Sequence, residues 1–225
     1  MALFDKFFGK VLYFPGCTLK FEAKDIQQRH EALLKKFKIK YVTLSQIEVC
    51  CGKPALDYGY KEDFHALRSR NTQTFQGQNI KKIITSCPSC YSIFKHHYED
   101  IEVEHITETV LNNLDKIDKK YPGQLITFYD SCNPQKYPEL YENPRKILTA
   151  LGFRLQELPF NKDKSLCCGK TLNLISPKIS SSMAKEVLSS VETRKMVTIS
   201  PECYLHFKRN KKQDIRIIEL SEVLL

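Results

Sequence analysis

The sequence contains no long apolar run and no compositionally biased segment. No stretch approaches the roughly 18 consecutive apolar residues that a membrane-spanning helix needs, and the N-terminus lacks the apolar core and small-residue cleavage site of a signal peptide. No Pro-, Gly- or Ser-rich tract interrupts a composition that is 42% hydrophobic and 27% charged. These absences argue against a membrane-spanning, secreted or disordered protein. We expect a soluble, cytoplasmic chain whose 225 residues can bury a substantial core.

Several common functional signatures are missing as well. The sequence has no phosphate-binding loop, dinucleotide-binding fingerprint or nucleophile triad, so a cofactor would have to carry any chemistry. Zinc-finger, helix-turn-helix and RNA-recognition patterns are absent, and the basic residues behind the net charge of +9 are scattered in small groups. We therefore expect no nucleic-acid partner. A positive surface suits an acidic protein partner instead.

The first ten residues carry Phe4, Phe7 and Phe8 at helical spacing. A short amphipathic helix of this kind could touch a membrane or a partner subunit. Packing of the segment on its own domain is the simpler interpretation. We therefore expect membrane contact to be peripheral at most, or to run through partners.

Nine cysteines are the main chemical feature of the chain. The cytoplasm keeps thiols reduced, and the count is odd, so structural disulfides are not expected. Soft thiolates bind zinc, copper(I) or iron–sulfur clusters. Metal or redox chemistry is therefore the leading interpretation.

The cysteines fall into two similar halves. Cys17 and Cys132 each follow an apolar run, the sequence Cys-Cys-Gly-Lys occurs at 50–53 and again at 167–170, and an apolar run enters a Pro-started helix at 83–91 and again at 196–204. The three offsets are 115, 117 and 113 residues. Such constant spacing indicates a duplication.

Apolar periodicity switches between strand and helix in both halves. We expect strands near 11–14, 39–44, 82–86, 125–129, 154–158 and 195–199, and helices near 22–37, 62–76, 144–151 and 178–192. Alternating strands and helices predict parallel βαβ units. The predicted fold is α/β, with two tandem pseudo-symmetric modules, residues 1–118 and 119–225, each a small parallel sheet with flanking helices.

Ligands of parallel sheets collect at the carboxyl ends of the strands, where several of these cysteines fall. We predict a complete five-thiol set in the first module and a four-thiol set in the second: Cys17, Cys50, Cys51, Cys87 and Cys90, then Cys132, Cys167, Cys168 and Cys203. A structural zinc usually takes four ligands from paired Cys-x-x-Cys knuckles. Five thiols with an adjacent pair fit an iron–sulfur cluster better, although a zinc-stabilised, non-redox scaffold stays open as an alternative.

Three further positions near the cysteines have two interpretations each. Gly52 and Gly169 could let the backbone approach a metal closely, or could simply form turns. Ser200 stands where the first half has Cys87. It could be an unusual oxygen ligand, but we favour an N-cap for the helix that begins at Pro201.

The pattern Cys17, Cys50-Cys51-Gly52 and Cys87-x-x-Cys90 resembles the cysteine-rich CCG domain of heterodisulfide reductase B and D subunits and related iron–sulfur oxidoreductase subunits. The stretches 129–132 and 141–148 are similar to the corresponding part of the D-type subunits. The resemblance implies a duplicated CCG fold and non-cubane 4Fe–4S clusters on five-cysteine motifs. The cluster type of the second, four-cysteine module stays open, and an ordinary cubane is one option.

The chain also departs from the family pattern. Ser131 and Asn133 replace the family's Pro and His around Cys132, and Lys170 and Thr171 replace a glycine run. These differences leave the substrate open. His96 and His97 could tune a cluster or carry protons, but ordinary surface histidines are the favoured interpretation.

The resulting hypothesis is an iron–sulfur subunit of a heterodisulfide-reductase-like oxidoreductase, which carries electrons to or from a disulfide or similar acceptor. An electron-transfer subunit of a lactate, glycolate or glycerol-3-phosphate dehydrogenase is the alternative redox function. We expect no catalytic residues beyond the cluster ligands. Because the chain lacks the ferredoxin-type Cys-x-x-Cys-x-x-Cys run, we predict a separate ferredoxin-like iron–sulfur subunit or flavoprotein subunit as partner.

Overall fold

The computed structural model describes residues 9–44, 46–47, 49–118, 120–132, 137–211 and 214–225. The predicted amphipathic segment, with Phe4, Phe7 and Phe8, lies outside the described residues apart from its last two positions. Within these ranges, every helix is too short or too polar to cross a membrane.

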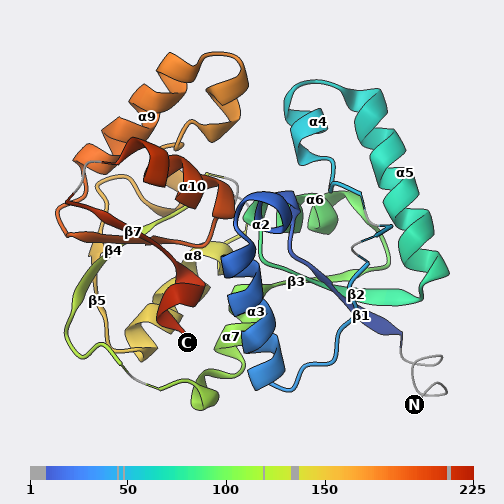
Figure 1. Cartoon of the computed structure of the whole chain (residues 1–225), viewed down its shortest axis with the longest axis horizontal. Coiled ribbons are helices and arrows are strands. Elements are labelled where there is room, and N and C mark those ends of the chain that lie inside the picture. The colour runs from blue at the N-terminus through green and yellow to red at the C-terminus, as the bar shows by residue number, and fades with distance from the viewer. Residues whose placement is uncertain (1–8, 45, 48, 119, 133–136, 212–213) are drawn as a thin grey trace.

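The first module contains a three-stranded parallel sheet in the order β1-β2-β3 (Figure 1). Its strands are β1 (Lys10–Phe14), β2 (Ile80–Thr85) and β3 (Glu102–His105). Its helices are α2 (Cys17–Glu22), α3 (Lys24–Lys36), α4 (Lys53–Asp57), α5 (Lys61–Gly77), α6 (Pro88–His97) and α7 (Ile106–Leu111), followed by the 3-10 turn η1 (Leu114–Lys116). The apolar runs of β1 and β2 are buried on both faces, as is usual for parallel strands.

The second module repeats this plan around a four-stranded parallel sheet in the order β5-β4-β6-β7. Its strands are β4 (Leu125–Tyr129), β5 (Arg154–Glu157), β6 (Lys195–Thr198) and β7 (Arg216–Glu219). Its helices are α8 (Glu139–Ala150), α9 (Pro177–Ser189) and α10 (Pro201–Asn210), with 3-10 turns η3 (Lys162–Lys164), η4 (Lys170–Leu174) and η5 (Leu220–Val223). The predicted fold class, two α/β modules with small parallel sheets, is confirmed.

The strand predicted near 39–44 is wrong. Only Val42 pairs with β1, through a bridge to Leu12 in which the Val42 N–H donates to the Val11 carbonyl (2.9 Å) and the Tyr13 N–H donates to the Val42 carbonyl (3.0 Å). This bridge occupies the place that β5 takes beside β4. The first sheet therefore ends in one hydrogen-bonded residue where the second sheet has a full strand.

Two predicted helices also have different boundaries. The helix expected near 22–37 divides at Ala23 into α2 and α3, so Cys17 itself begins a helix. The helix expected near 144–151 starts at Glu139 and carries Pro144 inside it. Its buried positions recur with helical spacing from Leu140 to Leu148, and this continuous apolar face outweighs the proline. The strands β3 and β7 were not predicted, because each is short and interrupted by charged residues.

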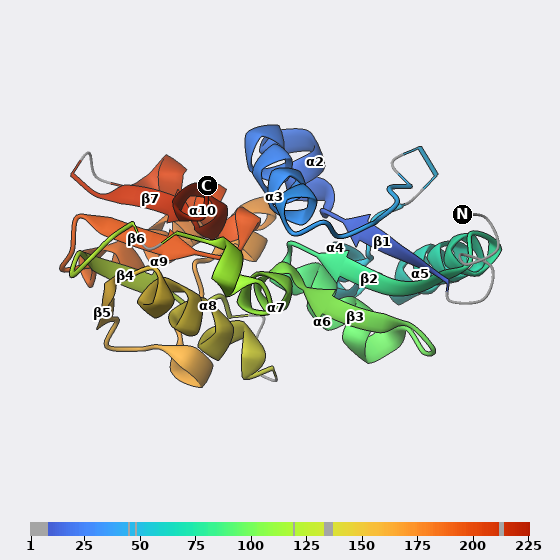
Figure 2. The same ribbon diagram turned by 90° about the horizontal axis from the view of Figure 1, so that it is seen from below.

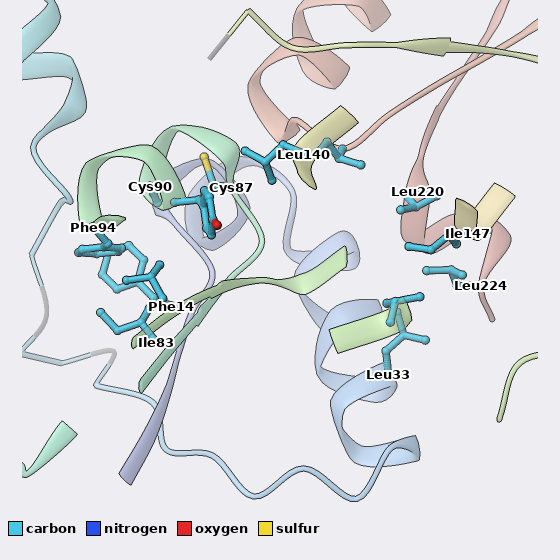
Figure 3. Close-up of a cluster of buried hydrophobic side chains, with 14 of the residues drawn as sticks. Phe14, Leu33, Ile83, Cys87, Cys90, Phe94, Leu140, Ile147, Leu220 and Leu224 are labelled. Carbon is cyan, nitrogen blue, oxygen red and sulfur yellow. The ribbon is translucent and has the colours of Figure 1, made fainter. Parts of the chain in front are cut away.

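Helix α3 joins the two modules. Figure 2 shows it above the junction between the sheets, with α7 and α8 packed side by side below. Leu33 of α3 belongs to one hydrophobic core with Ile147, Leu220 and Leu224 of the second module (Figure 3). The boundary predicted between residues 118 and 119 stays a prediction, but the cores on its two sides are continuous.

A buried contact between a histidine and a carboxylate crosses the same junction. His30 Nε2 of α3 lies 3.4 Å from Glu219 Oε1 at the end of β7, and both side chains are almost fully buried. The Ser221 N–H also donates to Glu219 Oε2 (2.9 Å). Burial raises the pKa of Glu219, but the neighbouring His30 and the hydrogen bonds from Ser221 outweigh it, so the net effect is a lowered pKa.

We expect Glu219→Ala to lower the free energy of unfolding by about 3 kcal/mol or more, because it leaves His30 buried without its partner. Glu22→Ala is the matched control, since Glu22 and Arg209 also join the two halves (2.9 Å) but lie in solvent. It should cost less than about 1 kcal/mol. Urea unfolding measures both values.

The pH dependence of the Glu219 contribution has a defined sign. A lowered carboxyl pKa stabilises the fold above the unfolded value of about 4.3, and this stabilisation is lost as the pH falls through the folded value. The difference in stability between the parent protein and Glu219→Gln should therefore shrink in acid. A difference that grows below about pH 4 would contradict the assignment.

Candidate cofactor site

The five cysteines of the first module come together at the carboxyl ends of β1 and β2. Cys17 begins α2 just after β1, Cys87 and Cys90 lie at the start of α6 after β2, and Cys50 and Cys51 precede α4. Thiol contacts connect Cys17 to Cys50, Cys50 to Cys51, Cys51 to Cys90 and Cys90 to Cys87. Cys17 is exposed, Cys50 is half-buried and the other three are buried. The predicted set of five is thus one continuous group of sulfur atoms with one exposed end.

The four cysteines of the second module form a corresponding group. Cys132 Sγ lies 3.4 Å from Cys167 Sγ, Cys168 Sγ lies 3.1 Å from Cys203 Sγ, and Cys167 contacts Cys168. In both modules the glycine N–H donates to the first thiol of the pair. Gly52 N lies 3.5 Å from Cys50 Sγ, and Gly169 N lies 3.4 Å from Cys167 Sγ. The repeat found in the sequence therefore extends to hydrogen bonds at the sulfur atoms.

Both glycines of the Cys-Cys-Gly motifs have left-handed backbones, with φ of 93° at Gly52 and 85° at Gly169. A Cβ on Gly52 would lie 2.7 Å from the Phe64 ring, and a Cβ on Gly169 would lie 2.8 Å from the Ser180 carbonyl oxygen. The turn interpretation explains both glycines: their backbones need a positive φ, and the atoms that an added Cβ would meet belong to α5 or α9 and not to the thiols.

The close backbone approach to the thiols occurs at Gly16 instead. A Cβ at Gly16 would lie 3.3 Å from Cys90 Sγ and 3.2 Å from Cys87 Cβ, and its φ of 86° already favours glycine. Sequence reasoning missed this residue, although it directly precedes Cys17. Glycine before the first cysteine lets the chain pass against the thiols of α6.

The thiols of each group share their protons unequally. Hydrogen bonds from Cys50 and Cys90 lower the pKa of Cys51 to about 6, and contacts with Cys132 and Cys168 lower the pKa of Cys167. The same contacts, together with burial, raise the pKa of the neighbours Cys17, Cys90, Cys132 and Cys168. In each group, one thiol of the adjacent pair is thus favoured as the thiolate, and the thiols that contact it hold their protons more firmly.

A cationic metal centre would favour loss of the remaining thiol protons, since metal ligands must be thiolates. The donor set, five or four soft sulfur atoms on helix starts and strand ends, fits an iron–sulfur cluster chemically. In the described part of the chain, no three His, Cys, Asp or Glu side chains surround a position for one metal ion. In each group the sulfur atoms instead form a chain of pairwise contacts, each thiol touching the next.

Ser200 caps α10. Its side chain accepts a hydrogen bond from the Cys203 N–H (3.3 Å), and the residue is 1% exposed. Cys87, at the same place before α6, makes no cap hydrogen bond. The N-cap role predicted for Ser200 is confirmed, and an additional role as an oxygen ligand stays a prediction.

A buried arginine positions the loop that carries Cys132. Arg145 makes paired hydrogen bonds to both carboxylate oxygens of Asp130 (2.8 and 2.7 Å) and to both of Glu157 (2.7 Å each). Asp130 also accepts from the Lys162 N–H (2.8 Å), and its carbonyl accepts from Ser165 Oγ (2.6 Å). These bonds fix the end of β4 against the chain that leads to Cys167. Arg145 lies in the stretch 141–148 that carries the family resemblance.

The positions of His96 and His97 fit the favoured interpretation of ordinary surface histidines. His96 is exposed at the C-terminal end of α6, and His97 packs against the Phe64 ring, both about 10 Å along the helix from Cys90. The surface interpretation of this pair agrees with the structure. The histidine beside a cysteine group is His206, which is buried one turn after Cys203 and contributes to lowering the pKa of Cys167.

The two cysteine groups face each other across the module junction. Ser89, between Cys87 and Cys90, donates from its hydroxyl to Glu202 Oε2 (3.2 Å), and Glu202 occupies the equivalent place before Cys203. Glu202 thus reaches out of the second module into a small pocket of the first, lined also by Gly16, Cys17, Cys51, Lys53, Cys87 and Cys90. Helices α2, α6 and α10 lie together at this junction (Figure 1).

Charged groups of both modules meet there. Lys53 of the first module acts electrostatically on Cys132 of the second, and both Lys53 and Lys170 act on Glu202. Burial raises the pKa of Glu202, whereas Ser89 and the two lysines oppose the increase. The Tyr58 hydroxyl, at the C-terminal end of α4, also donates to the Thr171 carbonyl in η4, and this hydrogen bond links the two modules. The two groups of thiols therefore belong to one composite site.

Comparison with known proteins gives a match of both halves, residues 11–95 and 126–208, to the cysteine-rich domain model named CCG. An uncharacterized iron–sulfur protein of Methanococcus maripaludis is 26% identical over 96% of this chain and 46% of its own length. The D-type polypeptide of the dihydromethanophenazine:CoB–CoM heterodisulfide reductase of Methanosarcina barkeri is 27% identical over 71% of this chain and 42% of its own length. Lactate utilization protein A 2 of Bacillus cereus is 25% identical over 79% of this chain and 82% of its own length. The chain thus spans less than half of the first two relatives.

Ser200→Ala tests the cap role of Ser200 against a ligand role. We expect a loss of about 1 kcal/mol of stability, from the lost N-cap, with unchanged iron content. Ser176→Ala is the control, because Ser176 caps α9 in the same way (Ile179 N to Ser176 Oγ, 3.5 Å). If Ser200→Ala alone loses iron or changes the visible absorption spectrum, Ser200 is a ligand.

Proposed function

Because the chain belongs to the family of proteins built from the cysteine-rich CCG domain, we propose that it is the iron–sulfur subunit of a heterodisulfide-reductase-like oxidoreductase. It would carry electrons to or from a disulfide or a similar acceptor. The observation that carries this proposal is the placement of two thiol groups on either side of one junction, with Glu202 of one module in the cysteine pocket of the other. An acceptor in that pocket would lie next to both groups.

Each module would hold one iron–sulfur cluster through its own cysteines. The ligands would be Cys17, Cys50, Cys51, Cys87 and Cys90 in the first module, and Cys132, Cys167, Cys168 and Cys203 in the second. Bound clusters would supply one-electron redox steps that side chains cannot perform. We further propose a non-cubane 4Fe–4S cluster in the first module, in line with its five thiols.

The chain itself would bind and orient the reacting groups. The N-termini of α6 and α10 each place the partial positive charge of a helix start beside a thiol group, which would favour the anionic form of a loaded site. Exposed Cys17 marks the open side of the pocket, where an acceptor would enter. Reduction of a disulfide there would break its S–S bond, and two electrons from a partner with two protons from solvent would give two thiols.

The partner that supplies or removes electrons would be a separate protein. We propose that this partner is a ferredoxin-like iron–sulfur subunit or a flavoprotein subunit, and that both proteins work in the cytoplasm. The net charge of +9 on this chain suits a partner with an acidic surface. A second candidate function is electron transfer for a lactate-type dehydrogenase. It is favoured by the similarity to lactate utilization protein A 2, which extends over 79% of this chain and 82% of that protein.

Metal analysis separates the redox functions from a zinc scaffold. We expect anaerobically purified protein to contain about four irons, with equal acid-labile sulfide, for each loaded module. Cys51→Ala should remove the iron of the first module, and Cys168→Ala should remove that of the second. Each variant serves as the control for the other.

A colourless protein that binds zinc and no sulfide would refute the proposed function. Loss of all iron in both variants would mean instead that the modules share one cluster. Equal iron in Cys51→Ala and the parent protein would show that Cys51 is not a ligand.

A further inference from the structure

The second module exposes a group of large apolar side chains beside its cysteines. Leu174, at the end of η4, is 81% exposed, and the following Ile175 is 70% exposed. Ile179, in the first turn of α9, is 54% exposed. Three such side chains occur within six residues, and clusters of exposed apolar side chains commonly mark interaction sites. We refer to these three residues as the η4–α9 patch.

The patch lies close to the second thiol group. Turn η4 begins directly after Cys167, Cys168 and Gly169, and a 3-10 helix rises about 2 Å per residue, so Leu174 lies about 10 Å along η4 from Gly169. In Figure 1, α9 and α4 stand on the same side of the molecule, beyond α2, α6 and α10. A protein that covers the patch would therefore approach the composite site from its outer side.

The segment that carries the patch is rich in lysine. Between Asp163 and Glu186 the sequence has four lysines and no acidic residue: Lys164, Lys170, Lys178 and Lys185. Lys170 also acts electrostatically on Glu202 at the junction. Exposed apolar side chains in a lysine-rich segment complement an acidic protein that has an apolar contact of its own.

The equivalent place in the first module lacks the cluster of exposed aliphatic side chains, although Tyr60, just after α4, is 63% exposed. At the repeat offset of 117 residues, Leu174 corresponds to Asp57 and Lys170 corresponds to Lys53. Asp57 and Lys53 form an ion pair within α4, and Ala55 and Leu56 of α4 pack against the core. The change from Asp57 to Leu174 thus removes the acidic partner of the lysine and adds an exposed apolar side chain. The cluster of exposed aliphatic side chains is therefore a feature of the second module.

We propose that the η4–α9 patch is the docking surface for an acidic electron-carrier protein of the ferredoxin class, which exchanges electrons with the chain through the second module. This proposal rests on the proposed redox function. Each contact would transfer one electron, so that the carrier is oxidised and the loaded chain is reduced by the same amount. A second copy of this chain fits the surface poorly, because it carries the same net positive charge.

The test uses the loaded chain and a dithionite-reduced, acidic 4Fe–4S ferredoxin as probe, with electron transfer followed by stopped-flow absorbance. We expect the Leu174→Ser, Ile175→Ser double variant to lower the second-order rate constant at least tenfold. The parent rate should fall as salt rises, because the lysines of this segment are screened. Leu125→Ser is the matched control, since Leu125 is also an exposed leucine (52%) but lies at the amino end of β4, away from the cysteines.

Equal rates for the double variant and the parent protein, or no reaction with the ferredoxin, would overturn the proposal. So would a parent rate independent of salt. Loss of binding to anionic vesicles in the double variant, with unchanged electron transfer, would identify a membrane surface instead, and a shift from dimer to monomer would identify self-association. Iron and sulfide are measured on every variant, so failure of docking in a loaded chain is distinct from failure of the redox function.

Discussion

The arrangement of the site depends on the contact between the starts of α6 and α10, where Ser89 donates to Glu202. These residues occupy equivalent positions in the repeat, so the two modules meet here through corresponding parts of their structure. Each immediately precedes a cysteine, and each helix carries that one cysteine, Cys90 or Cys203, in its first turn. Holding the two helix starts together therefore sets the separation of the two thiol groups. A carboxylate at such a place loses hydration, and the Ser89 hydroxyl with Lys53 and Lys170 offsets part of that cost.

The two halves share a backbone plan but differ in side chains at the site. The first has Cys87 where the second has Ser200, and the first has Gly16 where the second has Ser131. The thiol of Cys87 belongs to a row of five sulfur atoms, whereas the Ser200 hydroxyl is used by the Cys203 N–H. The buried Ser131 hydroxyl, in turn, has no hydrogen-bond partner among the described residues. Duplication thus preserved the fold while the two sites diverged.

Much of this architecture could be predicted from the sequence, because the repeat and the strand-end cysteines are local patterns. Apolar runs predicted β1, β2, β4 and β6, and the spacing of Cys17, Cys87 and Cys132 placed them at carboxyl ends of parallel strands. Contacts between distant residues were beyond such reasoning. Nothing local in residues 200–204 indicates that Glu202 enters the pocket of Cys17, or that His30 pairs with Glu219. The start of α8 was predicted too late because Pro144 is a strong local signal for the first turn of a helix. In the structure the helix already begins at Glu139, since its apolar face continues on both sides of the proline.

The continuous core across the junction has a consequence for how the protein is made. Leu33, which packs near the sheet of the first module, also needs Leu220 and Leu224, almost two hundred residues later in synthesis (Figure 3). On the ribosome, the first half therefore emerges with part of its apolar surface uncovered and with its five thiols not yet enclosed by Glu202. Loading of cofactors would then be a late step in maturation, after the second half has been synthesised, and the nascent chain would depend until that point on protection from oxidants and from premature metal capture.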